Sequence, residues 1–259
     1  ILLFKPIFFL KIIKKVKIMI FSIEGSTSKL SMALLKNNLI ISNKSIEITN
    51  ELAEIIVPAI KMFLYENSIS INQISHVAVG CGPGGFTGLR SVIAVVKGMI
   101  ISNDNLKTIG VNSLAALGIS VIEEAKKKRI KYIISLVDTK REDVFIQLFK
   151  LEKDKKSLFP FRSIDRTKVL KLENIQEYFI QNSLIDEDVL VVGYESYLIN
   201  NNSINIKISE NIIQVPNAFW IAKLAKLAID KFEYLNKTDI VYNKIEPLYI
   251  RSPEITKKI

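Results

Sequence analysis

The stretch from Gly82 to Arg90, GPGGFTGLR, carries the most chemical information in the sequence. Glycines permit positive φ angles and the close approach of another group. The loop precedes an apolar stretch typical of a helix, and free N–H groups at a helix N-terminus favour an anion. It matches neither the Walker A loop, because no Lys-Ser/Thr pair follows, nor G-x-G-x-x-G, because Thr87 takes the third glycine position. Two interpretations remain, a phosphate cradle with Gly84 and Gly85 as candidate contacts and a tight strand-to-helix connector.

Two acids, Glu24 and Asp138, occupy matching places in the sequence. Each follows an apolar stretch and precedes a polar turn and a second apolar stretch, and the two lie 114 positions apart. Such acids can hold Mg²⁺ through water beside ATP phosphates, whereas strand-end acids also form simple turns. Lys140 and Arg141 follow Asp138 after one residue, Thr139, and no third acid is apparent. We therefore take both acids as candidate nucleotide contacts and predict no catalytic residue and no metal ligand.

One histidine, His76, and one cysteine, Cys81, limit the remaining chemistry. Together they exclude a site with two imidazoles, an intramolecular disulfide and a cysteine-based zinc centre. So few cysteines fit a reducing, cytoplasmic environment. His76 stands just before a predicted strand, and we expect it at the surface or at a sheet edge. Cys81 has no base near it in the sequence, so we expect no nucleophile there.

The chain has 259 residues, 49% of them apolar, and a formal charge of +10. This apolar content suffices for a core in one or two domains. The many Ile, Asn and Lys residues have AT-rich codons, and a drift of the genome toward these codons would account for the positive charge. The charge would also attract polyanions such as RNA. The basic run from Lys126 to Lys131 has two interpretations. It is either a solvated helix end whose cations suit the helix dipole, or a tRNA-facing patch that lacks interleaved aromatic residues.

Residues 1–17 begin with the apolar run ILLFKPIFFL and continue with the basic run KIIKKVK. A secretory signal has the opposite order and a small-residue cleavage site, and the apolar run is too short to span a bilayer. We expect an unstructured extension before a start near Met19, which makes few contacts with the core. A membrane-surface anchor is the alternative, and no other apolar run suits a transmembrane helix.

Apolar patterning predicts an order of strands and helices that repeats along the chain. We expect strands at 16–23, 30–35, 39–48, 77–80, 107–111, 132–137, 144–151 and 190–193, and helices at 50–65, 89–102, 113–127 and after residue 217. Asn50 is the expected cap of the first helix. The segment IMIFSIEGSTSKLSMALL has the pattern of YIISLVDTKREDVFIQLF, and Gly80 and Gly193 end matching strands 113 positions apart.

The repeat predicts a duplicated fold. Asn112 and Asn217 precede matching helices only 105 positions apart, so the second copy lacks room for an equivalent of the helix after Gly88. We predict an α/β fold with mixed sheets in two lobes, the actin-like, sugar-kinase-like and RNase H-like architecture. The expected lobes are 18–129 and 130–259.

The glycine loop and its neighbours resemble one bacterial family. GPGGFTGLR, preceded by HVAVGC, resembles the glycine loop of the TsaB family, also called YeaZ, where a serine is usual at Gly85. IFSIEGSTSKLSMALL resembles the family's opening, which usually has Asp at Glu24, and NELAEIIVPAI resembles a helix in which His is common at Asn50. PLYIR, ending at Arg251, resembles the C-terminal signature. The resemblance covers about Lys17 to Arg251.

The resemblance implies a non-catalytic scaffold and activating subunit. It would pair with a TsaD-like transferase that adds a threonylcarbamoyl group to adenosine 37 of ANN-decoding tRNAs. A TsaE-like ATPase would join the pair, tRNA would bind through the complex, and ATP with Mg²⁺ would bind at the complex interface rather than tightly to this chain. A homodimer in the absence of the partner is also compatible. The alternatives are an actin-like ATPase or kinase acting alone, and an RNA-binding protein driven by charge.

Two expected helices are apolar on more than one face, which indicates burial on two sides. We therefore expect the second face to be exposed in a monomer and to form a partner interface. Ala94 and Gly98 lie four positions apart and would let another helix approach closely. The alternative is that these residues belong to an ordinary hydrophobic core that contains many isoleucines. The residues predicted for this interface are Leu52, Ile56, Ile60, Phe63, Val92, Val95, Val96 and Met99.

Overall fold

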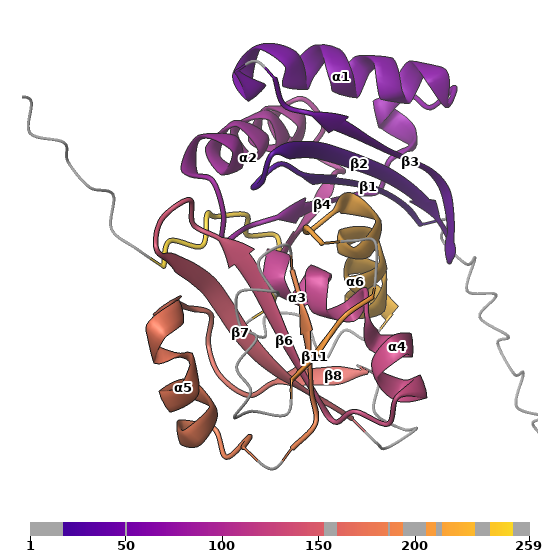
Figure 1. Ribbon diagram of the computed structural model, residues 1–259. Helices are drawn as coiled ribbons and strands as arrows, with labels where there is room; N and C mark the ends of the chain where they lie inside the picture. The colour runs from indigo at the N-terminus through magenta and orange to yellow at the C-terminus, as the bar shows by residue number, and fades with distance from the viewer. Residues whose placement is uncertain are drawn as a thin grey trace, which may run out of the picture.

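The computed structural model describes residues 18–49, 51–152, 160–185, 187–193, 206–210, 214–230 and 239–250. Within them the chain forms two mixed sheets, with helices on the outer faces and between the sheets (Figure 1). Three of our expectations lie outside the described residues. They are the extension at 1–17, the Asn50 cap, and the missing helix after Gly193, which would fall in 194–205.

The matching strands of the repeat lie in the same order in both sheets. The first sheet contains β12 (Ile240–Tyr242), β5 (Lys107–Val111), β4 (His76–Gly80), β1 (Met19–Glu24), β2 (Lys29–Lys36) and β3 (Leu39–Glu47). The second contains β11 (Ile206–Ile208), β10 (Val189–Val192), β6 (Tyr132–Asp138) and β7 (Asp143–Leu151), with β8 (Phe161–Ser163) and β9 (Lys168–Lys171) both paired to β7. The helices are α1 (Leu52–Glu66), α2 (Phe86–Ile101), α3 (Ser113–Ile119), α4 (Ile122–Lys127), α5 (Ile175–Gln181) and α6 (Ala218–Asp230), with short 3-10 turns at Ile71–Gln73 and Leu172–Asn174.

The two sheets share their pattern of pairing, while the register of the parallel pair differs by two residues. β1 pairs antiparallel with β2 and parallel with β4, just as β6 pairs antiparallel with β7 and parallel with β10. Ile20, four residues before Glu24, lies opposite His76 in the first sheet, whereas Tyr132, six residues before Asp138, lies opposite Val189 in the second. The expected duplicated, two-lobed α/β architecture is thereby confirmed.

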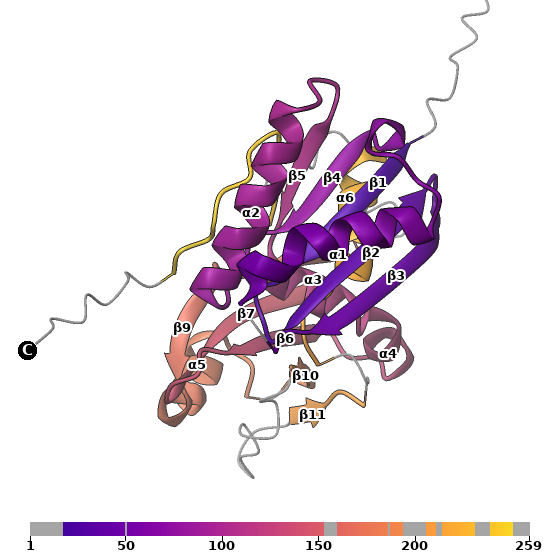
Figure 2. The ribbon, with the colours of Figure 1, turned by 90° about the horizontal axis from the view of Figure 1, so that it is seen from above.

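Helices form three layers around the sheets. α1 and α2 cover the outer face of the first sheet, α5 covers the outer face of the second, and α3 and α6 lie between the sheets (Figures 1 and 2). Each layer buries apolar side chains against a sheet, so three apolar clusters stabilise the fold. Among the described residues, no helix is both long enough and apolar enough to cross a membrane.

The helix that closes each half packs on the sheet of the other half. α3 follows β5 of the first sheet but packs on β6 and β7, whereas α6 follows β11 of the second sheet but packs on β1 and β2. β12, near the C-terminus, joins the first sheet beside β5. The boundary that we placed at residue 130 therefore does not separate the two sheets, because apolar patterning indicates that a helix is buried but not against which sheet.

Two further details differ from our expectations. The helix predicted at 113–127 divides at Ser120 and Val121 into α3 and α4. The elements that we did not predict, β8, β9, α5, β11 and β12, are three to seven residues long. Elements this short contain too few repeats of an apolar period to stand out in a sequence.

Candidate functional site

The Glu24 carboxylate ends β1 and is fully buried. One of its oxygens accepts a hydrogen bond from the Ser26 backbone N–H at 2.7 Å, and the other accepts one from the Ser113 hydroxyl at 2.6 Å. The Ser113 hydroxyl in turn accepts a bond from the Gly82 N–H at 3.1 Å. The acid therefore joins its own turn, the first turn of α3 and the start of the glycine loop.

Gly80, at the end of β4, makes room for this carboxylate. A Cβ atom added at Gly80 would lie only 1.8 Å from Oε2 of Glu24. Residues 24 and 80 are far apart in the sequence, and the parallel pairing of β1 with β4 brings them together. The requirement for glycine here comes from packing rather than from a turn.

The glycine loop packs against the turn between β1 and β2. Added Cβ atoms would lie 2.3 Å from the Ser26 carbonyl oxygen at Gly84 and 2.2 Å from the Gly25 carbonyl oxygen at Gly88. The Gly85 N–H donates to the Ser26 carbonyl at 2.6 Å. The close approach that the glycines predict does occur, and the approaching group is the chain's own backbone.

The hydroxyls of the same turn are a remaining polar feature. Among the described residues, the side-chain oxygens of Ser26 and Thr27 are buried and have no hydrogen-bond partner. The Ser26 oxygen lies 2.8 Å from the position that a Cβ on Gly84 would take. The loop thus covers this hydroxyl.

Asp138 has the matching place at the end of β6 but a different environment. Its carboxylate accepts a hydrogen bond from the Lys140 backbone N–H at 2.7 Å and pairs with the Lys140 ammonium at 2.7 Å. The carboxyl side chain is about a quarter exposed, at 23%. This is the turn-forming role of a strand-end acid. Among the described residues, no group of three or more His, Cys, Asp or Glu side chains is placed to hold a metal ion.

A second polar cluster joins the two lobes. The Asn112 side-chain amide donates to Gln147 of β7 and to Thr167, each at 2.9 Å, while its oxygen caps α3 by accepting the Leu114 N–H at 2.8 Å. Asp239, just before β12, accepts hydrogen bonds from Gln147 at 2.9 Å and from Ser163. Asn112 was recognisable as a helix cap, but nothing in the sequence pattern links Gln147, Thr167 or Asp239 to it.

Burial shifts the acidity of groups in and beside this cluster. Burial raises the pKa of Asp239, against the opposing effect of hydrogen bonds from Ser163, Gln147 and Asn112. Burial and the neighbouring Asp165 carboxylate, which accepts the Tyr178 hydroxyl at 2.8 Å, raise the pKa of Tyr178 well above its usual range. The polar groups satisfy one another, so the cluster acts as a structural connection between sheets.

His76 and Cys81 both lie inside the protein. We expected His76 at the surface or an edge, but it is only 8% exposed because β4 lies between β1 and β5. Its Nδ1 lies 2.9 Å from the Ser75 hydroxyl, and burial, assisted by the Lys107 charge, lowers its pKa to about 4. Burial, reinforced by the Glu24 charge, raises the pKa of the Cys81 thiol to about 12, which leaves the reactive thiolate scarce at neutral pH.

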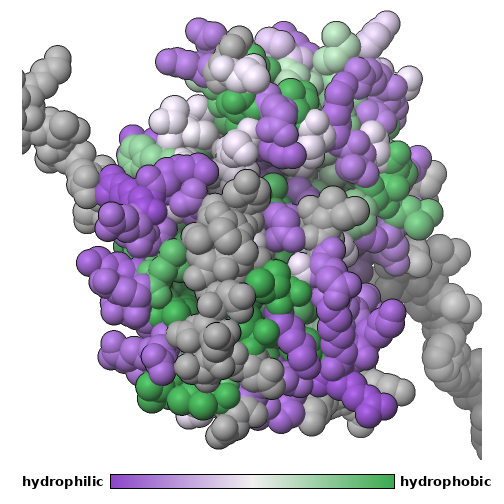
Figure 3. Space-filling view, viewed as in Figure 1, coloured by the Kyte–Doolittle hydropathy of each residue, from purple (hydrophilic) through white to green (hydrophobic). Residues whose placement is uncertain are grey.

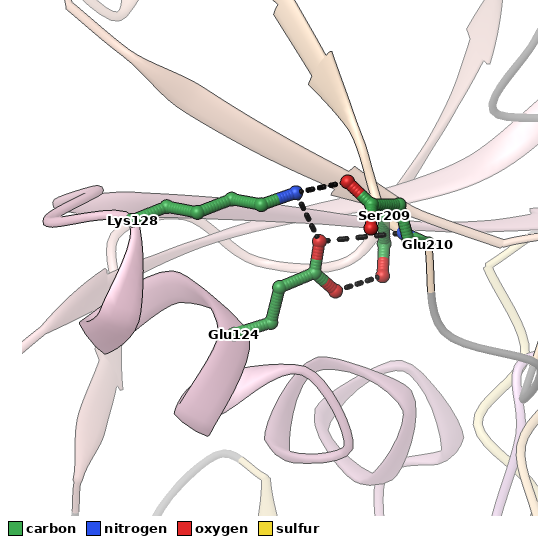
Figure 4. Close-up of polar contacts among 4 residues, drawn as sticks. All are labelled: Glu124, Lys128, Ser209 and Glu210. Carbon is green, nitrogen blue, oxygen red and sulfur yellow. Dashed lines mark hydrogen bonds and ion pairs between the residues drawn. The ribbon is translucent and has the colours of Figure 1, made fainter.

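The basic run at the end of α4 is largely paired with acids. Lys128 forms ion pairs with Glu124 and Glu210, each at 2.8 Å, and Ser209 donates to Glu124 (Figure 4). Burial alone would raise the pKa of Glu124, but the hydrogen bonds from Lys128 and Ser209 outweigh it and lower that pKa. Lys126 and Lys131 pair with Glu123 and Glu187. These pairs favour the structural interpretation of the run over a tRNA-facing patch.

The predicted partner residues on α1 and α2 face inward. Seven of the eight are buried, and Val95 is half-buried. The two helices pack on the first sheet and against each other, so these side chains form the core beneath them. The prediction is therefore wrong for Leu52, Ile56, Ile60, Phe63, Val92, Val96 and Met99.

Other apolar residues of the two helices are exposed instead. Val57, Met62 and Tyr65 of α1 and Ile101 of α2 are 42%, 55%, 82% and 84% exposed. Ala94 and Gly98 are exposed on α2, and nothing lies within 4 Å of a Cβ placed on Gly98. On the face drawn in Figure 3, hydrophilic residues separate the visible hydrophobic groups of the described residues.

The C-terminal segment meets the glycine loop. The Leu248 N–H donates to the Cys81 carbonyl at 2.8 Å, and the Tyr249 hydroxyl accepts a hydrogen bond from Nε of Arg90 at 2.8 Å. The Arg90 guanidinium lies 3.5 Å from the centre of the Phe86 ring, and the Phe86 and Tyr249 rings lie 5.2 Å apart. The structure thus brings GPGGFTGLR together with PLYI, the described part of the C-terminal motif, although the two are more than 150 residues apart in the sequence.

The sequence of this chain is similar to those of known proteins. The family model described as TsaD, tRNA N6-adenosine threonylcarbamoyltransferase, matches residues 40–257. The TsaB protein of Haemophilus influenzae is 26% identical over 212 residues, 79% of this chain and 81% of that protein. TsaB of Buchnera aphidicola subsp. Schizaphis graminum is 31% identical over 111 residues, 43% of this chain and 52% of that protein.

Solved structures share the fold. YeaZ from Pseudomonas aeruginosa superposes with a TM-score of 0.66 at 20% identity, covering 90% of this chain and 99% of that one. A protein described as similar to the peptidase YeaZ from the same organism gives 0.68 at 20% identity, with 90% and 100% covered. Because the family model spans well over half of the sequence and its TsaB relatives agree with it, the chain belongs to the TsaD-related family, in its TsaB (YeaZ) branch.

Proposed function

We propose that this chain is the TsaB-type subunit of tRNA threonylcarbamoyladenosine biosynthesis and acts as a non-catalytic scaffold for a TsaD-like transferase. Its place in the TsaB branch supports the pathway, since the relatives carry the description of tRNA threonylcarbamoyladenosine biosynthesis proteins. A TsaE-like ATPase joins the complex, tRNA binds through it, and any ATP and Mg²⁺ bind at its interface. The chain forms a homodimer when its partner is absent.

The observation that carries the scaffold role is the state of the glycine loop and of Glu24. The space beside the loop glycines is occupied by the chain's own turn between β1 and β2. Both oxygens of Glu24 already accept hydrogen bonds from within the chain. A nucleotide would have to displace these contacts and leave the buried donors of Ser26 and Ser113 unpaired, which costs about 1–3 kcal/mol for each group. This environment favours a structural role for the loop over catalysis.

The outward side of α1 and α2 supports the pairing role. Met62 and Ala94 replace the buried residues of our sequence-based prediction as the test positions, because their side chains are exposed. Ala94 and Gly98 lie one helical turn apart and leave room for a partner helix to approach closely. We place the TsaD-like subunit on this side, which we call the α1–α2 outer face and define by Val57, Met62, Tyr65, Ala94, Gly98 and Ile101.

Co-purification of the full chain with the TsaD-like protein of the same organism tests the pairing. Met62→Glu and Ala94→Glu should abolish co-purification with an unchanged melting temperature. Ile180→Glu is the matched control, because Ile180 is as exposed as Met62, at 55%, but lies on α5 of the other lobe. Normal co-purification of both face variants would contradict the proposed face.

An assay of threonylcarbamoyladenosine in tRNA tests the role in modification. With the TsaD-like and TsaE-like proteins present, modification should require this chain, while Glu24→Gln and Asp138→Asn variants that fold and form the complex should support it. Tight Mg-ATP binding with turnover by the isolated chain would instead favour an independent ATPase or kinase. Steeply salt-dependent tRNA binding without a partner would favour a self-standing RNA-binding protein.

A further inference from the structure

Arg90 is exposed but held in one position by two aromatic rings. Its guanidinium lies 3.5 Å from the centre of the Phe86 ring and 5.6 Å from that of Tyr249, and its Nε donates to the Tyr249 hydroxyl. An exposed arginine normally loses about 2 kcal/mol of rotamer freedom when a partner fixes it. Here the stack has already fixed the side chain, so a partner gains a rigid cation at low entropic cost.

Within the part of the chain that the structure describes, the hydrogen-bonding capacity of Arg90 is largely unused. Tyr249 takes the Nε–H, and no described residue accepts a hydrogen bond from the two terminal nitrogens. Some exposed cations are instead paired with acids: Arg162 pairs with Glu152 at 3.0 Å and Lys44 pairs with Glu66 at 2.8 Å. Two parallel N–H groups on a fixed guanidinium match a carboxylate, which binds them in a bidentate manner.

The C-terminal segment does not need the charge of Arg90 to stay in place. Ile245 is buried in the core beneath α1 and α2, the Leu248 N–H bonds to Cys81, and the Asn243 N–H bonds to the Thr108 carbonyl at 2.8 Å. Phe86 and Tyr249 nevertheless remain 37% and 47% exposed. Exposed tyrosine and arginine side chains around a fixed centre are the residue types that dominate binding energy at protein interfaces.

We infer that the Phe86–Arg90–Tyr249 stack is the specificity contact of the α1–α2 outer face and binds a carboxylate side chain of the partner protein. This inference rests on the proposed function. Arg90 lies on the same helix as Ala94 and Gly98, one and two turns before them, so the stack continues the outer face. RNA would require a series of cations, whereas after Arg90 the exposed residues of α2 include one cation, Lys97, among small and apolar residues.

Titration of the full chain with the TsaD-like subunit, at low and at high salt, tests this inference. Arg90→Gln should weaken binding about tenfold at low salt and should flatten its salt dependence, because a charge pair is lost. Tyr249→Phe keeps the ring and removes the hydroxyl that fixes Arg90, so it should weaken binding by a smaller factor. Arg162→Gln removes an equal charge from an exposed site on β8 and should change neither quantity.

The outcomes separate this inference from the proposed function. Wild-type chain that fails to bind the TsaD-like subunit would overturn both. Wild-type binding that Arg90→Gln leaves unchanged in affinity and in salt dependence would overturn the inference alone. Loss of tRNA binding by Arg90→Gln, with binding of the subunit intact, would assign the stack to RNA and overturn it as well. If Arg90→Gln lowers the melting temperature, Tyr249→Phe supplies the same comparison.

Discussion

The turn after β1 and the turn after β6 are copies of one unit, yet their acids have different surroundings. Glu24 is fully buried and joins its turn to α3 and to the glycine loop. Asp138 is partly exposed and pairs within its own turn with Lys140. The first turn is covered by the glycine loop, whereas no described residue covers the second in the same way. The duplicated sequence therefore places an acid at the end of β1 and of β6, and the elements packed over each acid determine its burial and its hydrogen bonds.

The same contrast extends along the matching strands. His76 of β4 and Val189 of β10 stand at matching places along their strands, each four residues before a glycine, Gly80 or Gly193. A titratable side chain thus occupies in the first lobe a place that is purely apolar in the second. Most of the following predictions use such pairs, so that a variant has its control in the other half of the molecule.

The largest effect is expected from Gly80→Ala. Its Cβ would overlap the Glu24 carboxylate, at 1.8 Å, and the buried carboxylate has no free space to enter. We expect the free energy of unfolding to fall by about 3 kcal/mol or more, as measured by urea denaturation. Glu24→Asp shortens the acid, so in the double variant it should recover part of this loss. Equal losses in the single and double variants would show that the carboxylate is not the obstacle.

The two helix caps provide the next comparison. Asn112→Ala should cost about 2–3 kcal/mol, because it removes the cap of α3, the donor to the buried Thr167 and one of the two donors to the buried Gln147. Asn217 caps α6 with one bond, to the Trp220 N–H at 3.3 Å, and Asn217→Ala should cost about 1 kcal/mol or less. Equal costs in chemical denaturation would contradict a connecting role for the Asn112 cluster.

The two acids themselves give a smaller but more direct contrast. Glu24→Gln should lower the free energy of unfolding by about 2 kcal/mol, since an amide cannot accept the bonds from both Ser26 and Ser113. Asp138→Asn should change it by less than about 0.5 kcal/mol, because the pair with Lys140 lies at the surface. A larger loss for Asp138→Asn than for Glu24→Gln would reverse the comparison of the two turns.

The smallest effect is a pH dependence from His76. Its pKa is lowered from 6.5 to about 4 in the folded chain, so between these values the unfolded chain binds more protons. The stability contributed by neutral His76 is therefore complete above pH 6.5 and is lost as the pH falls through 4. We expect a loss of about 1–2 kcal/mol over this window, allowing for partial solvent screening.

Thermal unfolding across this pH range measures the effect. His76→Gln should flatten the pH dependence between 6.5 and 4, and Val189→Ala, in the matching strand, should lower stability by the same amount at every pH. A wild-type stability that stays constant across the window would show that His76 is protonated in the folded chain without cost.

Local patterning determined much of the fold. Apolar runs and turn signals located β1 to β7, except for shifts of a few residues at their ends, and the repeat of those signals predicted two lobes. The glycines of the loop predicted a close approach, because only a residue without a Cβ atom tolerates it, and the structure shows that approach at Gly84 and Gly88. These properties depend on neighbours in the sequence, so the sequence alone carries them.

Tertiary structure decided which groups meet. The sequence did not show that Gly80 accommodates Glu24, that His76 is buried, or that Arg90 stacks with Tyr249 at the other end of the chain. It also did not show that α3 and α6 exchange sheets, or that the apolar residues of α1 and α2 chosen as a partner surface form the core. Each depends on elements distant in sequence that pack side by side, and apolar patterning reports that a side chain is buried without identifying what buries it.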